Sequence, residues 1–170
     1  MKNHVVKIAA LLFLLAIGAA STAQAAELDI TPLFAGYESG CDISGIPASR
    51  LVYWANPNEQ GKIAPTSALP PIWRGHVGSP VVEDRHEHWF VKVPLREVRF
   101  HGLREIRLER WYGKGCGISG WSLVLDAPID AARRHIDEKA FKLDENLNFK
   151  PELAAEPSSR TTQVVCDVSM

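Results

Sequence analysis

A series of strand-like segments between His88 and Leu125 constrains the fold more than any other feature of the 170-residue sequence. Residues 88–94 alternate apolar and polar side chains, which is the period of a half-buried strand. Residues 98–100 and 104–112 then form a predicted hairpin around residues 101–103, and residues 121–125 give a further strand. Strands that follow one another without intervening helices favour an antiparallel over a parallel sheet.

The charged residues of this hairpin predict its register. One alignment places Arg99 opposite Glu105 and Glu97 opposite Arg107. Opposite charges on facing positions stabilise antiparallel strands. We therefore interpret the arginine-rich appearance of this region as a salt-paired, solvent-exposed face rather than as a binding patch.

The clearest helical pattern spans residues 129–143. Its apolar residues recur on one helical face: Ile129, Ala132, Ile136, Ala140 and Leu143. The sequence thus predicts an α+β fold, in which an antiparallel β-sheet carries one main packed helix. About 145 residues remain after a leader of residues 1–25, and this length fits a single small domain over residues 26–170.

The stretch from about residue 55 to residue 85 is rich in proline, with 5 of the 11 prolines of the sequence. Proline lacks a backbone donor and disfavours helix at the preceding residue, so we expect a long loop here. Residues 144–160 are polar and contain two prolines, which predicts a second loop. A closing strand is predicted at residues 161–168.

The pattern Y-x-x-G-C-x-I-S-G occurs twice, at residues 37–45 and 112–120. Each copy precedes a strand-like run, at residues 50–54 and 121–125. Two copies are too few for a repeat array. The pattern could mark two related half-domains or the chance reuse of one loop type, and both interpretations remain open.

Three cysteines, Cys41, Cys116 and Cys166, allow one intramolecular disulfide. Cys41 and Cys116 both lie in glycine-flanked loop sequence, which favours their pairing. Cys166 lies on one face of the closing strand and reads as a buried, inert residue. Cys166 remains the alternative partner, because sequence alone does not fix connectivity.

The first 25 residues have the order of a secretory signal peptide: a basic start with Lys2 and Lys7, an apolar run over residues 8–18, and Ala23-Gln24-Ala25. The apolar run is shorter than the about 20 residues that span a bilayer. No later run is long enough either, so we expect no membrane span after cleavage and a periplasmic or secreted protein.

Composition and motifs give little support for binding of nucleic acid, metal or phosphate. Without the leader the sequence has 17 basic and 20 acidic residues, a balance that does not indicate nucleic-acid binding. His86 and His88, two apart on a predicted strand, are weak candidates for metal ligands, because a third ligand is not evident. The glycine-rich residues 113–120 lead into a strand rather than into the helix that a phosphate loop requires. We therefore expect no cofactor.

The remaining candidates are partner-binding residues on two loops: Trp73 and Arg74 in the proline-rich segment, and Lys114 and Ser119 in the glycine-rich segment. Tryptophan and arginine are enriched at interface hot spots, although Trp73 also fits an anchor that packs back onto the domain. The Ser119 hydroxyl is a candidate donor to a catalytic group of a partner.

These features suggest a non-enzymatic protein that binds a macromolecular partner, of the inhibitor or immunity type, for example against a cell-wall-degrading enzyme or a toxin. The nucleophile elbow G-x-S-x-G is absent from the sequence. A small-ligand or metal-binding periplasmic protein and an unrecognised hydrolase are the alternatives.

We predict that the exported protein is processed after Ala25, because the basic, apolar and small-residue regions occur in the order that signal peptidase reads. Intact-mass spectrometry of protein from the periplasm or medium should give an N-terminus near Ala26. A mature protein that still begins at Met1 would contradict export by this route.

Overall fold

The computed structural model describes residues 26–115, 117–144, 149–156 and 160–170. Within them, seven strands form one sheet in the order β1-β3-β4-β5-β7-β6, and β2 also pairs with β3. The strands are β1 (Leu28–Asp29), β2 (Val81–Arg85), β3 (His88–Phe100), β4 (Leu103–Gly113), β5 (Ser119–Leu125), β6 (Glu152–Ala155) and β7 (Thr162–Asp167). Every pairing of these strands is antiparallel except that of β1 with β3, so the predicted antiparallel sheet is confirmed as the main element.

The helices of the described residues are short: α1 (Ser49–Trp54), α2 (Pro71–Arg74), α3 (Ile129–His135) and three 3-10 turns, η1 (Thr31–Phe34), η2 (Thr66–Ala68) and η3 (Glu138–Ala140). The prediction of one main helix over residues 129–143 is not confirmed. Ile136 leaves helical geometry with φ −117° and ψ 116°. Asp137 then caps η3 by accepting a hydrogen bond from the backbone N–H of Lys139 at 3.0 Å, and the predicted apolar residue Leu143 is 51% exposed.

Helix α1 replaces the strand expected at residues 50–54. Ala48, Leu51, Val52 and Ala55 are all buried, and their spacing is that of one helical face. The first Y-x-x-G-C-x-I-S-G copy therefore leads into a helix, whereas the second leads into β5. The segments that follow the two copies therefore do not have the same structure.

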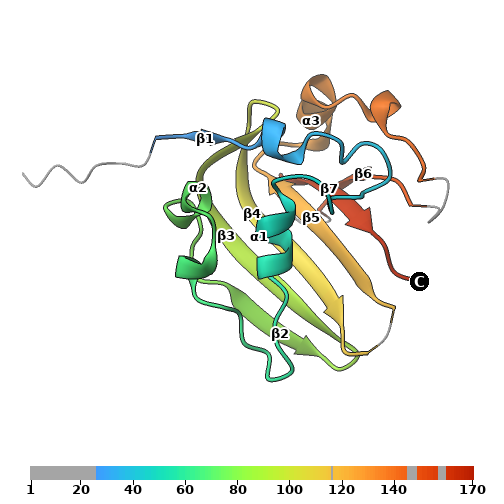
Figure 1. Cartoon of the computed structure of the whole chain (residues 1–170). Coiled ribbons are helices and arrows are strands. Elements are labelled where there is room, and N and C mark those ends of the chain that lie inside the picture. The colour runs from blue at the N-terminus through green and yellow to red at the C-terminus, as the bar shows by residue number, and fades with distance from the viewer. Residues whose placement is uncertain (1–25, 116, 145–148, 157–159) are drawn as a thin grey trace, which may run out of the picture.

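The N-terminal part of the protein covers one face of the sheet. In Figure 1, η1 and α1 lie across the front of the strands. Their apolar side chains pack on the sheet through an aromatic cluster, in which the Phe34 and Trp121 rings are 5.4 Å apart and the Tyr37 and Phe100 rings are 5.5 Å apart. The core thus lies between this covering segment and β3, β4 and β5.

Both segments that were expected to be loops contain regular structure. The proline-rich segment includes α2 and β2, and it is anchored in the core by Trp73, which is 1% exposed. Residues 144–160 include β6, which pairs with β7 and extends the sheet. Pairing with a neighbouring strand, rather than local propensity, determines these strands.

A disulfide joins Cys41 of the covering segment to Cys166 of β7, with a Cα–Cα distance of 5.5 Å. The favoured pairing of Cys41 with Cys116 is therefore wrong, and the alternative partner is the correct one. Cys116 itself lies outside the described residues. Cys166 is buried, as expected, but it is covalently bonded rather than inert. The bond attaches the N-terminal covering segment to a strand near the C-terminus of the sequence.

The predicted hairpin is present, but next to its turn the register is shifted by one residue, and a further irregularity follows between Pro94 and Val98. His101 and Gly102 form a two-residue turn with φ values of 49° and 76°, so Phe100 pairs with Leu103. Positive φ at both positions is typical of the type I′ hairpin turn. A shift in register changes which side chains face one another across the two strands. Glu105 consequently lies opposite Val98, inside the core, instead of pairing with Arg99.

This register buries the carboxyl group of Glu105 in the core, which is unusual for a glutamate. Its side chain is 1% exposed, and neither carboxylate oxygen has a hydrogen-bond partner among the described residues. Burial raises the pKa of this carboxyl well above its usual value, because the charged form loses its hydration. The group is thus held in the protonated form at pH values where an exposed glutamate is ionised.

We predict that Glu105 makes the protein less stable as the pH rises. Above the pKa of an unfolded glutamate, about 4.3, the folded state holds the proton more tightly than the unfolded state. The unfolding free energy should therefore fall with pH, by up to about 1.4 kcal/mol per unit, until the folded carboxyl ionises. Glu105→Gln should remove this contribution, and denaturant unfolding between about pH 5 and pH 8 measures it.

The exposed Glu152→Gln substitution serves as the matched control and should keep the wild-type pH dependence. If the stability curves of wild type and Glu105→Gln run parallel over this range, the buried carboxyl does not titrate as described.

Candidate functional site

The candidate site lies on the helix-covered face, where β3 begins, β4 ends and β5 begins. Alternate residues of a strand share a face, so Arg110 and Tyr112 of β4 point to the same side. Arg110 lies opposite Trp121 of β5, and Tyr112 lies between Trp89 of β3 and Ser119 of β5. This end of the sheet extends beyond α1 and is approached by the proline-rich segment (Figure 1).

A groove of about 800 Å³ runs between the proline-rich segment and the end of β4. It is lined by Pro57, Asn58, Glu59, Gln60, Trp89, Tyr112, Gly113, Lys114 and Gly115. Tyr112 is 39% exposed and gives the groove an aromatic wall. The Lys114 ammonium lies 3.8 Å from the Trp89 ring centroid, a cation–π contact, and forms an ion pair with Asp84.

The proline-rich wall of the groove is held by its own hydrogen bonds. Asn58 Oδ1 accepts from the backbone N–H groups of Gln60 at 3.1 Å and Lys62 at 2.9 Å. Gly61 has φ +73°, and a Cβ at this position would lie 2.9 Å from the Trp89 ring. Glycine is therefore required here both by the backbone conformation and by the close approach to the indole.

Arg110 connects the groove to the core. It is only 4% exposed, and its Nε donates to Asn56 Oδ1 at 2.7 Å. Its Nη1 donates to the carbonyl oxygens of Trp111 at 2.7 Å and Gly120 at 2.6 Å, and to the Ser119 hydroxyl at 3.0 Å. Burial lowers its pKa to about 10, so the guanidinium remains charged at neutral pH. No described carboxylate forms an ion pair with it.

The structure separates the four predicted partner-binding residues. Lys114 lines the groove and Ser119 lies beside it, but Trp73 is buried and so anchors its loop. Arg74 is on α2, where its Nε donates to the carbonyl oxygen of Leu69 at 2.7 Å. Ser119 belongs to β5 rather than to a protruding loop, and its hydroxyl is bonded to Arg110.

His86 and His88 do not share a strand face. His86 has φ +63° and lies in the turn between β2 and β3, where Arg85 pairs with His88. The geometric premise of the metal hypothesis is therefore wrong. Within the described ranges, no group of three or more histidine, cysteine, aspartate or glutamate side chains is arranged to hold a metal ion.

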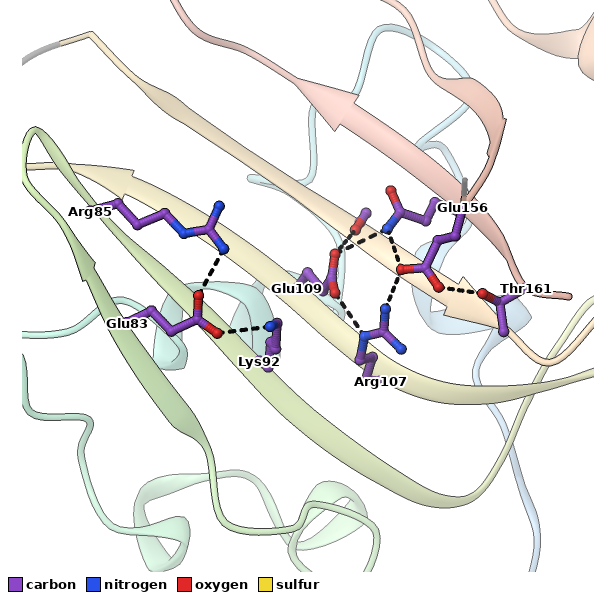
Figure 2. Close-up of polar contacts among 9 residues, drawn as sticks. Glu83, Arg85, Lys92, Arg107, Glu109, Glu156 and Thr161 are labelled. Atoms are coloured by element: carbon purple, nitrogen blue, oxygen red, sulfur yellow. Dashed lines mark hydrogen bonds and ion pairs between the residues drawn. The ribbon is translucent and has the colours of Figure 1, made fainter. Parts of the chain in front are cut away.

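The opposite face of the sheet carries the arginine-rich region. Figure 2 shows its ion pairs: Arg85–Glu83, Lys92–Glu83, Arg107–Glu109 and Arg107–Glu156. The prediction of a salt-paired face is confirmed for Arg107, although its partner is not Glu97. The charges of this face neutralise one another, whereas the charge of Arg110 on the covered face does not meet a described carboxylate.

Apart from Lys114, the sequence did not indicate the side chains that form the groove. It gave Trp89 no role beyond the alternation of its strand, and it gave Arg110 and Tyr112 no role at all. The alternation of β4 contained the signal, because Arg110 and Tyr112 have the same parity as the buried Leu108. An arginine on the buried face of a strand is uncommon unless it has a specific set of partners.

Comparison with known proteins gives no relative. No protein-family model matches the sequence, and no curated protein or solved structure matches it either. Among the described residues, no helix combines the length and the apolar character needed to cross a membrane. The function is therefore inferred from the site alone.

Proposed function

We propose that this protein is an exported, non-enzymatic binding protein of the inhibitor or immunity type, which holds a segment of a protein partner in the groove between residues 57–60 and residues 112–115. The observation that supports this most is that the groove is bounded on both sides by internally fixed segments. Ordering a flexible loop on binding costs free energy, and a preformed groove avoids most of this cost.

The chemistry of the groove indicates how a partner is held. Trp89 and Tyr112 offer aromatic surface, and such side chains are enriched at binding hot spots. Lys114 is already paired with Asp84, so its charge is partly neutralised. We infer that aromatic and apolar contacts supply most of the affinity, with Glu59 and Gln60 forming a polar rim.

The disulfide and the leader sequence both support the proposed compartment. Disulfides persist in oxidising environments outside the cytoplasm, and the Cys41–Cys166 bond fits such an environment. Together with the signal-peptide pattern, this supports a protein that acts in the periplasm or after secretion, where extracellular enzymes or toxins are available as partners.

We predict that Tyr112→Ala and Lys114→Glu each weaken partner binding about tenfold or more, because each changes a side chain that lines the groove. Partners are captured from the periplasm on immobilised wild-type protein, identified by mass spectrometry and then purified. Their affinities for wild type and variants are measured by calorimetry.

Leu143→Ala is the control, because Leu143 is also an exposed apolar residue, 51% accessible, but it does not line the groove. It should bind the partner as wild type does. If all three variants bind equally well, the groove is not the recognition surface. If the purified protein turns over an ester, peptide or glycan substrate, the non-enzymatic proposal is wrong.

A further inference from the structure

Two buried hydrogen-bond donors line a second, smaller cavity of about 170 Å³ next to α1. Trp121 is 2% exposed, and its Nε1–H has no acceptor among the described residues. An indole N–H can only donate, and leaving it buried without an acceptor is unfavourable. Trp121 lines the cavity, so an acceptor that binds there and reaches the edge of the indole would satisfy this N–H.

Arg110 is the second donor. Its four hydrogen bonds use Nε and Nη1, all go to neutral groups, and Nη2 bonds to no described residue. A buried charge is normally paired with an opposite charge. The cavity therefore presents a cation without a counter-ion next to an unused N–H group, and both features favour an anionic acceptor.

The remaining walls limit the kind of anion. The hydroxyl-bearing residues Tyr53 and Ser119 line the cavity and add polar contacts. Asp42 also lines it and is exposed, with its Oδ1 accepting from the Ser44 backbone N–H at 2.8 Å. Hydrogen bonds from Ser44 lower the pKa of Asp42, so this carboxylate is charged at neutral pH. A second negative charge nearby disfavours a dianion such as phosphate.

The cavity lies between the Cys41 loop, residues 40–43, and strands β4 and β5. We propose that it binds a single carboxylate group, which accepts hydrogen bonds from Arg110 and from the Trp121 indole. The inference goes beyond the proposed function, since it requires no protein partner. A free organic acid, the terminal carboxylate of a polypeptide and an acidic side group share this chemistry, and peptide binding separates them.

The indole N–H of Trp121 is a direct reporter for the test. Its resonance in a ¹H–¹⁵N spectrum is assigned from its loss in Trp121→Phe. N-acetylglycine, which ends in a carboxylate, should shift this resonance saturably with millimolar affinity. Its neutral amide, N-acetylglycinamide, should not shift it, and inorganic phosphate should bind more weakly than the carboxylate.

Three peptides identify the source of the group: one with a free carboxyl terminus, one amidated, and one amidated with a single internal aspartate. Binding of the first alone points to the end of a polypeptide, and binding of the third to an acidic side group. Binding of N-acetylglycine but of none of the peptides points to a free acid. All three results support a carboxylate site.

Two variants test the roles of the charges. Arg110→Gln removes the cation and should abolish the titration, provided its spectrum shows a folded protein. Asp42→Asn keeps the oxygen that accepts from the Ser44 backbone N–H but removes the negative charge of Asp42. This variant should bind N-acetylglycine several-fold more tightly than wild type. The ratio of its affinities for N-acetylglycine and phosphate should be smaller than in wild type. This surface substitution keeps the proposal testable even if Arg110→Gln does not fold.

Three results would overturn the assignment. The first is that neither wild type nor Asp42→Asn responds to any carboxylate. The second is an equal shift with the amide. The third is a preference of the wild-type protein for phosphate.

Discussion

The Cys41–Cys166 disulfide is the constraint on which the rest of the structure depends, because it fixes the N-terminal covering segment to β7, the last strand in the sequence. The bond closes a loop with a sequence separation of 125 residues. In the loop-entropy description, a loop of this length stabilises the folded state by about 5 kcal/mol. The bond positions the Cys41 loop above β5 and β7, and α1 and the proline-rich segment follow directly in the sequence.

Arg110 links the covering segment to the sheet through a hydrogen bond to Asn56. An arginine on the core face of a central strand is unfavourable without partners, and the partners come from the layer itself and from β5. Asn56, just after α1, accepts from Nε, and the remaining bonds go to residues of β4 and β5. The same side chain lies beneath both hollows of this surface, facing Tyr112 near the groove and lining the smaller cavity. Arg110 is thus both a buried residue of the core and part of the lining of the smaller cavity.

Periodicity predicted β3, β4, β5 and β7 well, but it predicted the relation of the strands to one another poorly. The alternation of residues 88–94 and the hairpin were visible because half-buried strands repeat every two residues. The register was not, because it depends on whether the turn at His101 has two residues or three. The disulfide was missed because glycine-flanked loops say nothing about which cysteines approach each other in space. The groove was found only in part: Lys114 was predicted, but Trp89 and Tyr112 meet the proline-rich segment only through tertiary packing.

Non-reducing peptide mapping of the exported protein tests the central claim most directly. The peptide that contains Cys41 should be recovered cross-linked to the C-terminal peptide that contains Cys166, and reduction should release both. This result would place the covering segment over β5 and β7, where residues 40–43 line the smaller cavity. A cross-link between Cys41 and Cys116 would contradict the structure, because Cys41 would then be bonded to the β4–β5 connection instead of to β7.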